Sequence, residues 1–291
     1  MLALREAIER LGWQAQAWKG GSVVCLDATK EQREVGLENL YRRLRREPRD
    51  TWPDLLVDLL GSVPAEAGKA PENLSEVADQ LMVRLGPPVR GQGAEVGIWS
   101  MPLVDRHLSA FLVIDFPTSM SYVNDAMIAS SGQAADYWFQ RGLANLRDKS
   151  APTCFAPVHD ESGLLQAQAS DAYDSSRALL VDELIPGHEE DGFYVIVPGR
   201  DHCFVLLVTA ESLMLAPWLR SIAIKMCKDM PYPISPELFW VRGGLWHHFE
   251  IEEGGNELRV TPPAAFVEIM ERLRPDIAQP PEQDDSDSLP N

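Results

Sequence analysis

Six polar residues on either side of a predicted strand have side chains that bind anions or form ion pairs. They are Asp171, Tyr173, Ser176, Arg177, Arg200 and Asp201. The first four lie near the start of a helix that we predict to begin at Ser170, a residue type favoured at the N-cap. The other two lie in the turn between residues 193–197 and 203–208, two apolar segments typical of central strands. We therefore expect the six side chains to meet at one end of a sheet.

Two interpretations of this cluster make different demands on its arginines. In the first, which we favour, Arg177 and Arg200 pair with carboxylates and fix the helix to the strand turn. In the second, the arginines line a small polar pocket and hold an anionic group through charge-assisted hydrogen bonds. A network leaves both guanidinium groups satisfied, whereas a pocket leaves at least one donor edge free.

Other combinations that carry catalysis or bind metals are weaker. Ser176, His202 and Asp201 include the groups of a hydrolytic triad, but Ser176 falls inside the predicted helix and not on an exposed turn. Among the six histidines only His247 and His248 are close in sequence, and neighbours in a strand point to opposite faces. Phosphate-binding, dinucleotide-binding, zinc-protease and nucleophile-elbow motifs are absent from the sequence. We therefore predict no metal and no cofactor, and the sequence favours a protein that is not an enzyme.

Hydrophobic periodicity predicts the elements that position these residues. Residues 1–86 are predicted to form a helix-rich part with one strand, at residues 22–27. The last helix of this part is predicted over residues 74–85, where apolar side chains recur at helical spacing. An earlier predicted helix has a basic face, which we interpret as a solvated surface and not as a phosphate site. This face consists of Arg42, Arg43, Arg45 and Arg46.

Residues 87–275 are predicted to form an α+β main part. Its sheet is mixed and mostly antiparallel, flanked by amphipathic helices, and Gly243-Gly244 predicts a two-residue hairpin turn. Asp115 follows a predicted strand, where an aspartate is more typical of a turn than of a general base. Residues 276–291 are acidic, rich in proline and poor in apolar groups, which predicts a disordered tail.

Several short motifs resemble one known family. From Asp171 the chain reads D-x-Y-x-x-S-R-x-L-L, and the following strand ends in P-x-R-D. With four further blocks in the same order, this pattern resembles the YtpQ-like family of bacterial proteins of unknown function, over roughly residues 20–250. The blocks lie at residues 37–41, 115–117, 142–146 and, for the closing block, 232–235 with 244–246, and Gly142 stands where that family usually has alanine. The resemblance implies a bacterial origin and a fold, and it implies no mechanism.

The composition limits the partners. The chain has 291 residues, of which 45% are hydrophobic and 24% charged, as in ordinary globular proteins. A net charge of −18 disfavours nucleic acid and anionic membranes as partners, and it favours another protein with a basic surface. No segment reaches the ~20 apolar residues of a membrane helix. Four widely spaced cysteines indicate a reducing compartment, so we expect a cytoplasmic protein.

Two classes of function follow from these observations. The first is a non-enzymatic protein-interaction module, an adaptor or chaperone-like protein that holds a partner chain through its acidic surface or a sheet edge. The alternative is an enzyme of unknown chemistry, such as a hydrolase, or a small-anion-binding protein that uses Arg177 and Arg200. A cleft at the polar cluster favours the alternative, and a broad exposed groove favours the first.

Overall fold

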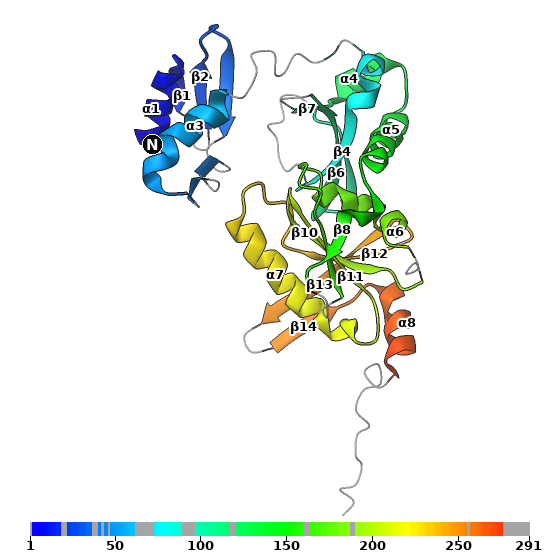
Figure 1. Cartoon of the computed structure of the whole chain (residues 1–291). Helices are drawn as coiled ribbons and strands as arrows, with labels where there is room; N and C mark the ends of the chain where they lie inside the picture. The colour runs from blue at the N-terminus through cyan, green and yellow to red at the C-terminus, as the bar shows by residue number, and fades with distance from the viewer. Residues whose placement is uncertain are drawn as a thin grey trace, which may run out of the picture.

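The computed structural model of the chain has the predicted α+β fold, with three sheets and helices packed on them (Figure 1). All pairings between the named strands are antiparallel. The predicted tail, residues 276–291, lies outside the described residues. The structure describes residues 2–18, 22–36, 40–41, 44–45, 47–61, 71, 73–88, 97–116, 120–159, 163–186, 190–254 and 257–275.

The first residues form a three-stranded sheet packed against two helices. Its strands, in the order β1-β2-β3, are β1 (Gln14–Trp18), β2 (Ser22–Leu26) and β3 (Gln32–Gly36), and the helices are α1 (Leu2–Arg10) and α3 (Trp52–Gly61), the latter preceded by the 3₁₀ turn η1 (Arg49–Thr51). The prediction of one strand in this part is wrong. β1 (QAQAW) alternates glutamine with alanine, a small side chain, and is mostly exposed, and β3 (QREVG) has no apolar alternation, so neither resembles the apolar run of β2. In the predicted basic face, Arg42, Arg43 and Arg46 lie outside the described residues. The remaining one, Arg45, donates to the Asp229 carboxylate at 3.0 Å.

The second sheet is built around one buried strand, β6 (Leu108–Asp115). This strand pairs with β4 (Leu81–Gly86) on one side and with β5 (Ser100–Val104) and β7 (Met120–Tyr122) on the other. Its side chains are almost all buried. It therefore forms the centre of a four-stranded sheet that is contiguous with the main core.

The helix predicted over residues 74–85 is wrong. The chain there forms a 3₁₀ helix, η2 (Leu74–Gln80), and then enters β4. A short run of mostly apolar residues fits a buried strand as well as a helix, and the pairing of β4 with β6 decides between them. β4, at the end of the predicted N-terminal part, thus belongs to a sheet whose other strands come from later residues. The division into domains stays a prediction.

The helix α5 (Ala135–Asp148) packs on β4 and β6 of this second sheet, and α4 (Asp125–Ser131) packs against η2. The close approach of α5 requires a small residue at position 142. A Cβ atom on Gly142 would lie 2.8 Å from Leu112 Cδ1 and 3.3 Å from the carbonyl carbon of Met82. Glycine at this position is therefore a packing requirement of the α5 contact with β4 and β6.

The third sheet has seven strands. In spatial order β14-β13-β12-β10-β11-β9-β8 they are β14 (Glu257–Thr261), β13 (Leu245–Gly254), β12 (Leu238–Arg242), β10 (Phe193–Gly199), β11 (His202–Leu207), β9 (Leu164–Ala167) and β8 (Phe155–Pro157). The strands predicted to be central, β10 and β11, are paired and buried. Gly243 and Gly244 both have positive φ, 54° and 74°, as the predicted two-residue hairpin turn requires.

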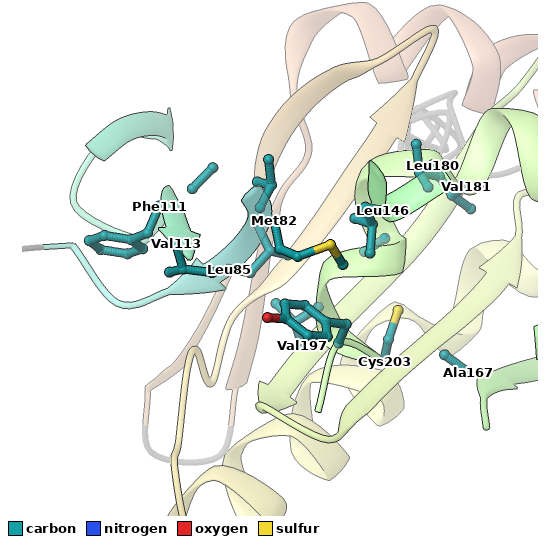
Figure 2. Close-up of a cluster of buried hydrophobic side chains, with 14 of the residues drawn as sticks. Met82, Leu85, Phe111, Val113, Leu146, Ala167, Leu180, Val181, Val197 and Cys203 are labelled. Carbon is teal, nitrogen blue, oxygen red and sulfur yellow. The ribbon is translucent and has the colours of Figure 1, made fainter. Parts of the chain in front are cut away.

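The two faces of this sheet bury different sets of side chains. Tyr194 and Ile196 pack under α7 (Ala216–Asp229) and α8 (Ala264–Leu273). Val195 and Val197 point to the opposite face, where they share a core with the second sheet. Figure 2 shows Val197 in this core together with Met82 of β4. The short helical segments that complete the fold are η3 (Pro152–Cys154), η4 (Ser175–Leu180), α6 (Val181–Leu184) and η5 (Ser212–Leu215). Of these, η4 contacts β4, β10 and β11 and so joins the two sheets.

Candidate functional site

The loop before η4 does not form the helix predicted to begin at Ser170. Ser170 and Ala172 have positive φ angles of 57° and 71°, so neither is helical, and Ser170 is not an N-cap. The carboxylate of Asp174 accepts hydrogen bonds from the backbone N–H groups of Ala169 and Ser170 at 2.9 and 3.0 Å. This buried carboxylate folds the loop back on itself, and the helical turn begins only at Ser175.

Arg177 is fully buried and paired with carboxylates. Its Nη1 and Nη2 each lie 2.7 Å from an oxygen of Asp171, and Nη1 lies 3.3 Å from Asp174 Oδ1. Nη2 also donates to the carbonyl of Lys149, on the C-terminal side of α5. Its side chain is 0% exposed, so no ligand reaches it. Arg177 thus belongs to a structural network and not to a pocket.

The pKa shifts of this network agree with its geometry. Burial acts to lower the pKa of Arg177, but hydrogen bonds and charge from Asp171 more than compensate, so the pKa is raised. Burial likewise acts to raise the pKa of Asp171, and the Arg177 hydrogen bonds bring it below its usual value. Both groups are therefore charged at neutral pH, and the pair stabilises the folded state.

Ser176 has a structural role as well. Its hydroxyl accepts a hydrogen bond from the backbone N–H of Leu85 at 3.2 Å, which ties η4 to the edge of β4. The side chain is 0% exposed. A substrate has no access to this oxygen, so Ser176 does not supply the exposed nucleophile that a hydrolytic triad with His202 and Asp201 requires.

Arg200 lies in the turn between β10 and β11, and its carbonyl accepts a hydrogen bond from the N–H of Ser175 at 3.2 Å, which joins this turn to the start of η4. Its guanidinium forms a bidentate pair with Asp201, at 2.8 and 2.9 Å, and lies 4.2 Å from the centre of the Tyr232 ring. Tyr232 has a φ of 55°, uncommon for a bulky residue, and its carbonyl accepts from the Arg200 N–H at 3.0 Å. The strained backbone at Tyr232 therefore places its ring under the guanidinium.

A cleft opens on one side of Arg200, and we call it the Arg84 pocket. Its volume is about 550 Å³. It is lined by Arg84, Leu85, Gly86, Pro87, Met120, Tyr122, Arg200, Tyr232, Pro233 and Ile234. A second cleft of about 570 Å³ lies on the side of Asp171, Asp174 and Asp201 and is acidic. Arg200 also lines this second cleft, but three aspartates outnumber it there, whereas the described lining of the Arg84 pocket has two arginines and no carboxylate.

Arg84 is the residue of this pocket that the sequence predictions missed. Its Nη1 lies 2.8 Å from the sulfur of Met120, and its guanidinium carbon lies 5.9 Å from the centre of the Tyr173 ring. No carboxylate of the described residues lies within ion-pair distance of it. Burial lowers the pKa of Arg84, and the positive charge of Arg200 lowers it further. An anion between the two arginines would relieve both effects.

Arg84 was missed because the sequence predicted a helix at this position and not a strand. In a helix over residues 74–85, Arg84 falls on the solvent face, where an arginine needs no explanation. In β4 it is the single charge in the run LMVRLG, whose other side chains are buried. A cation inside a buried strand is the signal that the sequence carried.

Tyr173 is a buried residue that contacts both arginines: its carbonyl accepts from the Arg177 N–H at 3.2 Å, and its ring faces the Arg84 guanidinium. Its ring lies 5.0 Å from Lys149 Nζ, which pairs with Asp115 at 3.1 Å. The pKa of Tyr173 is raised well above its usual range, chiefly by burial and also by the nearby Asp115 carboxylate. Tyr173 is therefore a neutral phenol, and Asp115 is engaged in an ion pair and not placed as a general base.

Comparison of the chain with models of known protein families, with curated proteins and with solved structures found no match. The resemblance to the YtpQ-like family accordingly stays a prediction. No helix in the described part of the chain is both long and apolar enough to cross a lipid bilayer.

Proposed function

We propose that this protein binds a small organic anion, a carboxylate or a phosphate monoester, in the Arg84 pocket. The observation that carries the proposal is the Arg84 guanidinium, which lies in a cleft beside Arg200 without a described carboxylate partner. Arginine presents five N–H donors in a planar fork that matches carboxylate and phosphate oxygens. The hydrogen bond seen for Arg84 goes to a thioether sulfur, a weak acceptor that an anion would outcompete.

The walls of the pocket favour a ligand with an apolar or planar body. Met120, Tyr122, Tyr232 and Pro233 present thioether, aromatic and aliphatic surface around the two cations. The volume of the cavity, about 550 Å³, is within the usual range for sites that bind small molecules. The guanidinium groups would fix the charged end, and the rings would contact the remainder.

The same lining supports binding without catalysis. The described residues that line the pocket include two arginines and two tyrosines, but no carboxylate, histidine, cysteine or serine. General acid–base and nucleophilic catalysis both rely on such groups within hydrogen-bond reach of the substrate. The proposed activity is therefore recognition of the anion.

Isothermal titration calorimetry with phenyl phosphate and benzoate tests the proposal. We expect Arg84→Gln to bind roughly 10- to 100-fold more weakly, because a hydrogen bond to a charged group contributes about 1.5–3 kcal/mol and every ~1.4 kcal/mol is tenfold in affinity. Arg141→Gln is the matched control, since Arg141 pairs with Asp79 on the surface of α5 and lies outside the pocket. Equal affinity of Arg84→Gln and the wild type, or no binding of either anion, contradicts the proposal.

A second candidate, the protein-interaction module, is favoured by the edge of the large sheet. Among the described strands β14 pairs only with β13, and its Leu258 and Val260 are 47% and 40% exposed on one face. An apolar edge strand can pair with a strand of another chain, and the charge of −18 favours a basic partner. Four free cysteines support a cytoplasmic setting for either function. Crosslinking in the native host tests this candidate. Recovery of no stoichiometric partner contradicts it, and so does a partner that still binds the Val260→Lys variant.

A further inference from the structure

Three side chains that are distant in sequence meet beside the Arg84 pocket. His107 lies in the turn between β5 and β6, Glu237 directly precedes β12, and His248 lies in β13. His248 Nε2 is 3.2 Å from Glu237 Oε2, and the rings of His107 and His248 are stacked with their centres 4.0 Å apart. One ligand atom from each residue lies within 4.8 Å of the other two. A turn of the second sheet, between β5 and β6, thus meets two neighbouring segments of the third sheet, at β12 and β13.

The spacing of these atoms is close to that of a metal site. Bonds of ~2.0–2.1 Å in a tetrahedral zinc site hold neighbouring ligand atoms about 3.3 to 3.4 Å apart. The Glu237 and His248 atoms already have this separation. His107 is carried by a partly exposed turn, and its ligand atom lies within 4.8 Å of the other two, so it needs a movement of up to about 1.5 Å and a rotation of its ring out of the stack on His248, which a change in its side-chain torsions can supply. Two imidazoles and a carboxylate are a ligand set that zinc prefers.

The surroundings fit an open site with an oriented carboxylate. Arg220 on α7 donates from Nε to Glu237 Oε2 at 3.2 Å, the kind of outer hydrogen bond that fixes a metal-binding carboxylate. His107 and Glu237 line a cleft of about 540 Å³, which leaves room for a water or a ligand atom in a fourth position. This cleft shares Pro87 and Ile234 with the Arg84 pocket, so the two openings adjoin.

We propose that His107, Glu237 and His248 bind a divalent first-row transition metal of the zinc type, with the fourth position open to the cleft. The inference is independent of the proposed anion binding, since it uses none of the residues of the Arg84 pocket. The prediction of no metal rested on His247 and His248 alone. His247 points to the other face of β13, where its ring stacks on Trp240 at 4.9 Å, and the partners of His248 come from segments that only the fold brings together.

Titration of the chelator-treated full-length protein with Co²⁺, followed by visible absorption, and with Zn²⁺ against a chromophoric chelator tests the site. We expect the wild type to take up a single equivalent of metal and to show the intense visible bands of four-coordinate Co²⁺. His107→Gln and His248→Gln should lose this binding. His247→Gln is the matched control and should retain it, because that imidazole lies on the opposite face of the same strand.

Each outcome decides the proposal. No stoichiometric binding by the wild type overturns it, as does binding that survives both His107→Gln and His248→Gln. Loss of binding in His247→Gln to the same extent as in His248→Gln also overturns it. If His248→Gln fails to fold, the metal titration of His107→Gln alone decides the proposal. His107 lies in a surface turn, so its substitution should leave the fold intact. An increase in the melting temperature on Zn²⁺ addition, seen in the wild type and His247→Gln but not in His107→Gln, supports it independently of absorption.

Discussion

Replacement of Arg177 by alanine tests whether the buried ion pairs of Arg177 stabilise the fold. The guanidinium is 0% exposed, forms a bidentate pair with Asp171 and contacts Asp174, whose side chain is 3% exposed. Arg177→Ala removes the cation and leaves these carboxylates without it in a buried site. Breaking a buried ion pair in this way costs about 3–5 kcal/mol. We therefore expect a loss of this size in the free energy of unfolding.

Urea denaturation monitored by tryptophan fluorescence measures the effect, with Arg141→Ala as the control. Arg141 also pairs with an aspartate, Asp79, but at the surface, where the two side chains are 40% and 89% exposed. An exposed pair contributes ~1 kcal/mol or less, so the control should unfold close to the wild type. A double-mutant cycle with Asp171→Ala isolates the pairwise energy. If Arg177→Ala is destabilised by no more than Arg141→Ala, the buried-network interpretation is wrong.

Three further predictions concern packing and pH. Val195→Asp should prevent folding, because this fully buried strand residue would carry an unpaired charge worth several kcal/mol; a soluble, cooperatively unfolding variant would contradict it. Gly142→Ala should cost ~1–3 kcal/mol in urea denaturation, because its Cβ would lie 2.8 Å from Leu112; unchanged stability would show that α5 can shift freely. The folded pKa of Asp171 is lowered, so its contribution is present above its unfolded pKa of about 3.9 and is lost as the pH falls through the folded pKa. Asp171→Asn should therefore lose less stability than the wild type as the pH falls below ~4, and parallel curves would refute the assignment.

Local sequence signals predicted the elements that are buried or that turn sharply. β10 and β11 are continuous apolar runs, and the hairpin at Gly243-Gly244 depends on a conformation that glycine adopts readily. In such cases the local preference and the tertiary environment agree.

Two predictions failed where a contact that the apolar pattern does not express determines the conformation. β4 is a strand because it pairs with β6, about 30 positions along the chain, and its apolar spacing fits a helix equally well. The loop at Ser170 is not helical because the Asp174 carboxylate binds the backbone N–H groups before it. The first deciding interaction is distant in sequence, and the second is a local side-chain contact with the backbone that hydrophobic periodicity does not express.

The candidate sites follow the same rule. The favoured interpretation that Arg177 pairs with carboxylates agrees with the structure, where its partners Asp171 and Asp174 lie in the same short segment. Arg84 became a candidate only when its strand was recognised, and Arg200 reaches it from another sheet. The pairing of His107 with His248 joins residues 141 positions apart, a relation that no spacing in the sequence expresses.

Crystals soaked in tungstate, a heavy analogue of phosphate, test anion binding at the Arg84 pocket most directly. Tungsten gives a strong anomalous signal, so its position is read from the diffraction data without assumptions about the ligand. Our account predicts a peak within hydrogen-bond distance of the Arg84 guanidinium, on the side of Arg200, and no peak there in crystals of Arg84→Gln. An empty pocket in the wild type, or a carboxylate of the chain itself bound to Arg84, would contradict it.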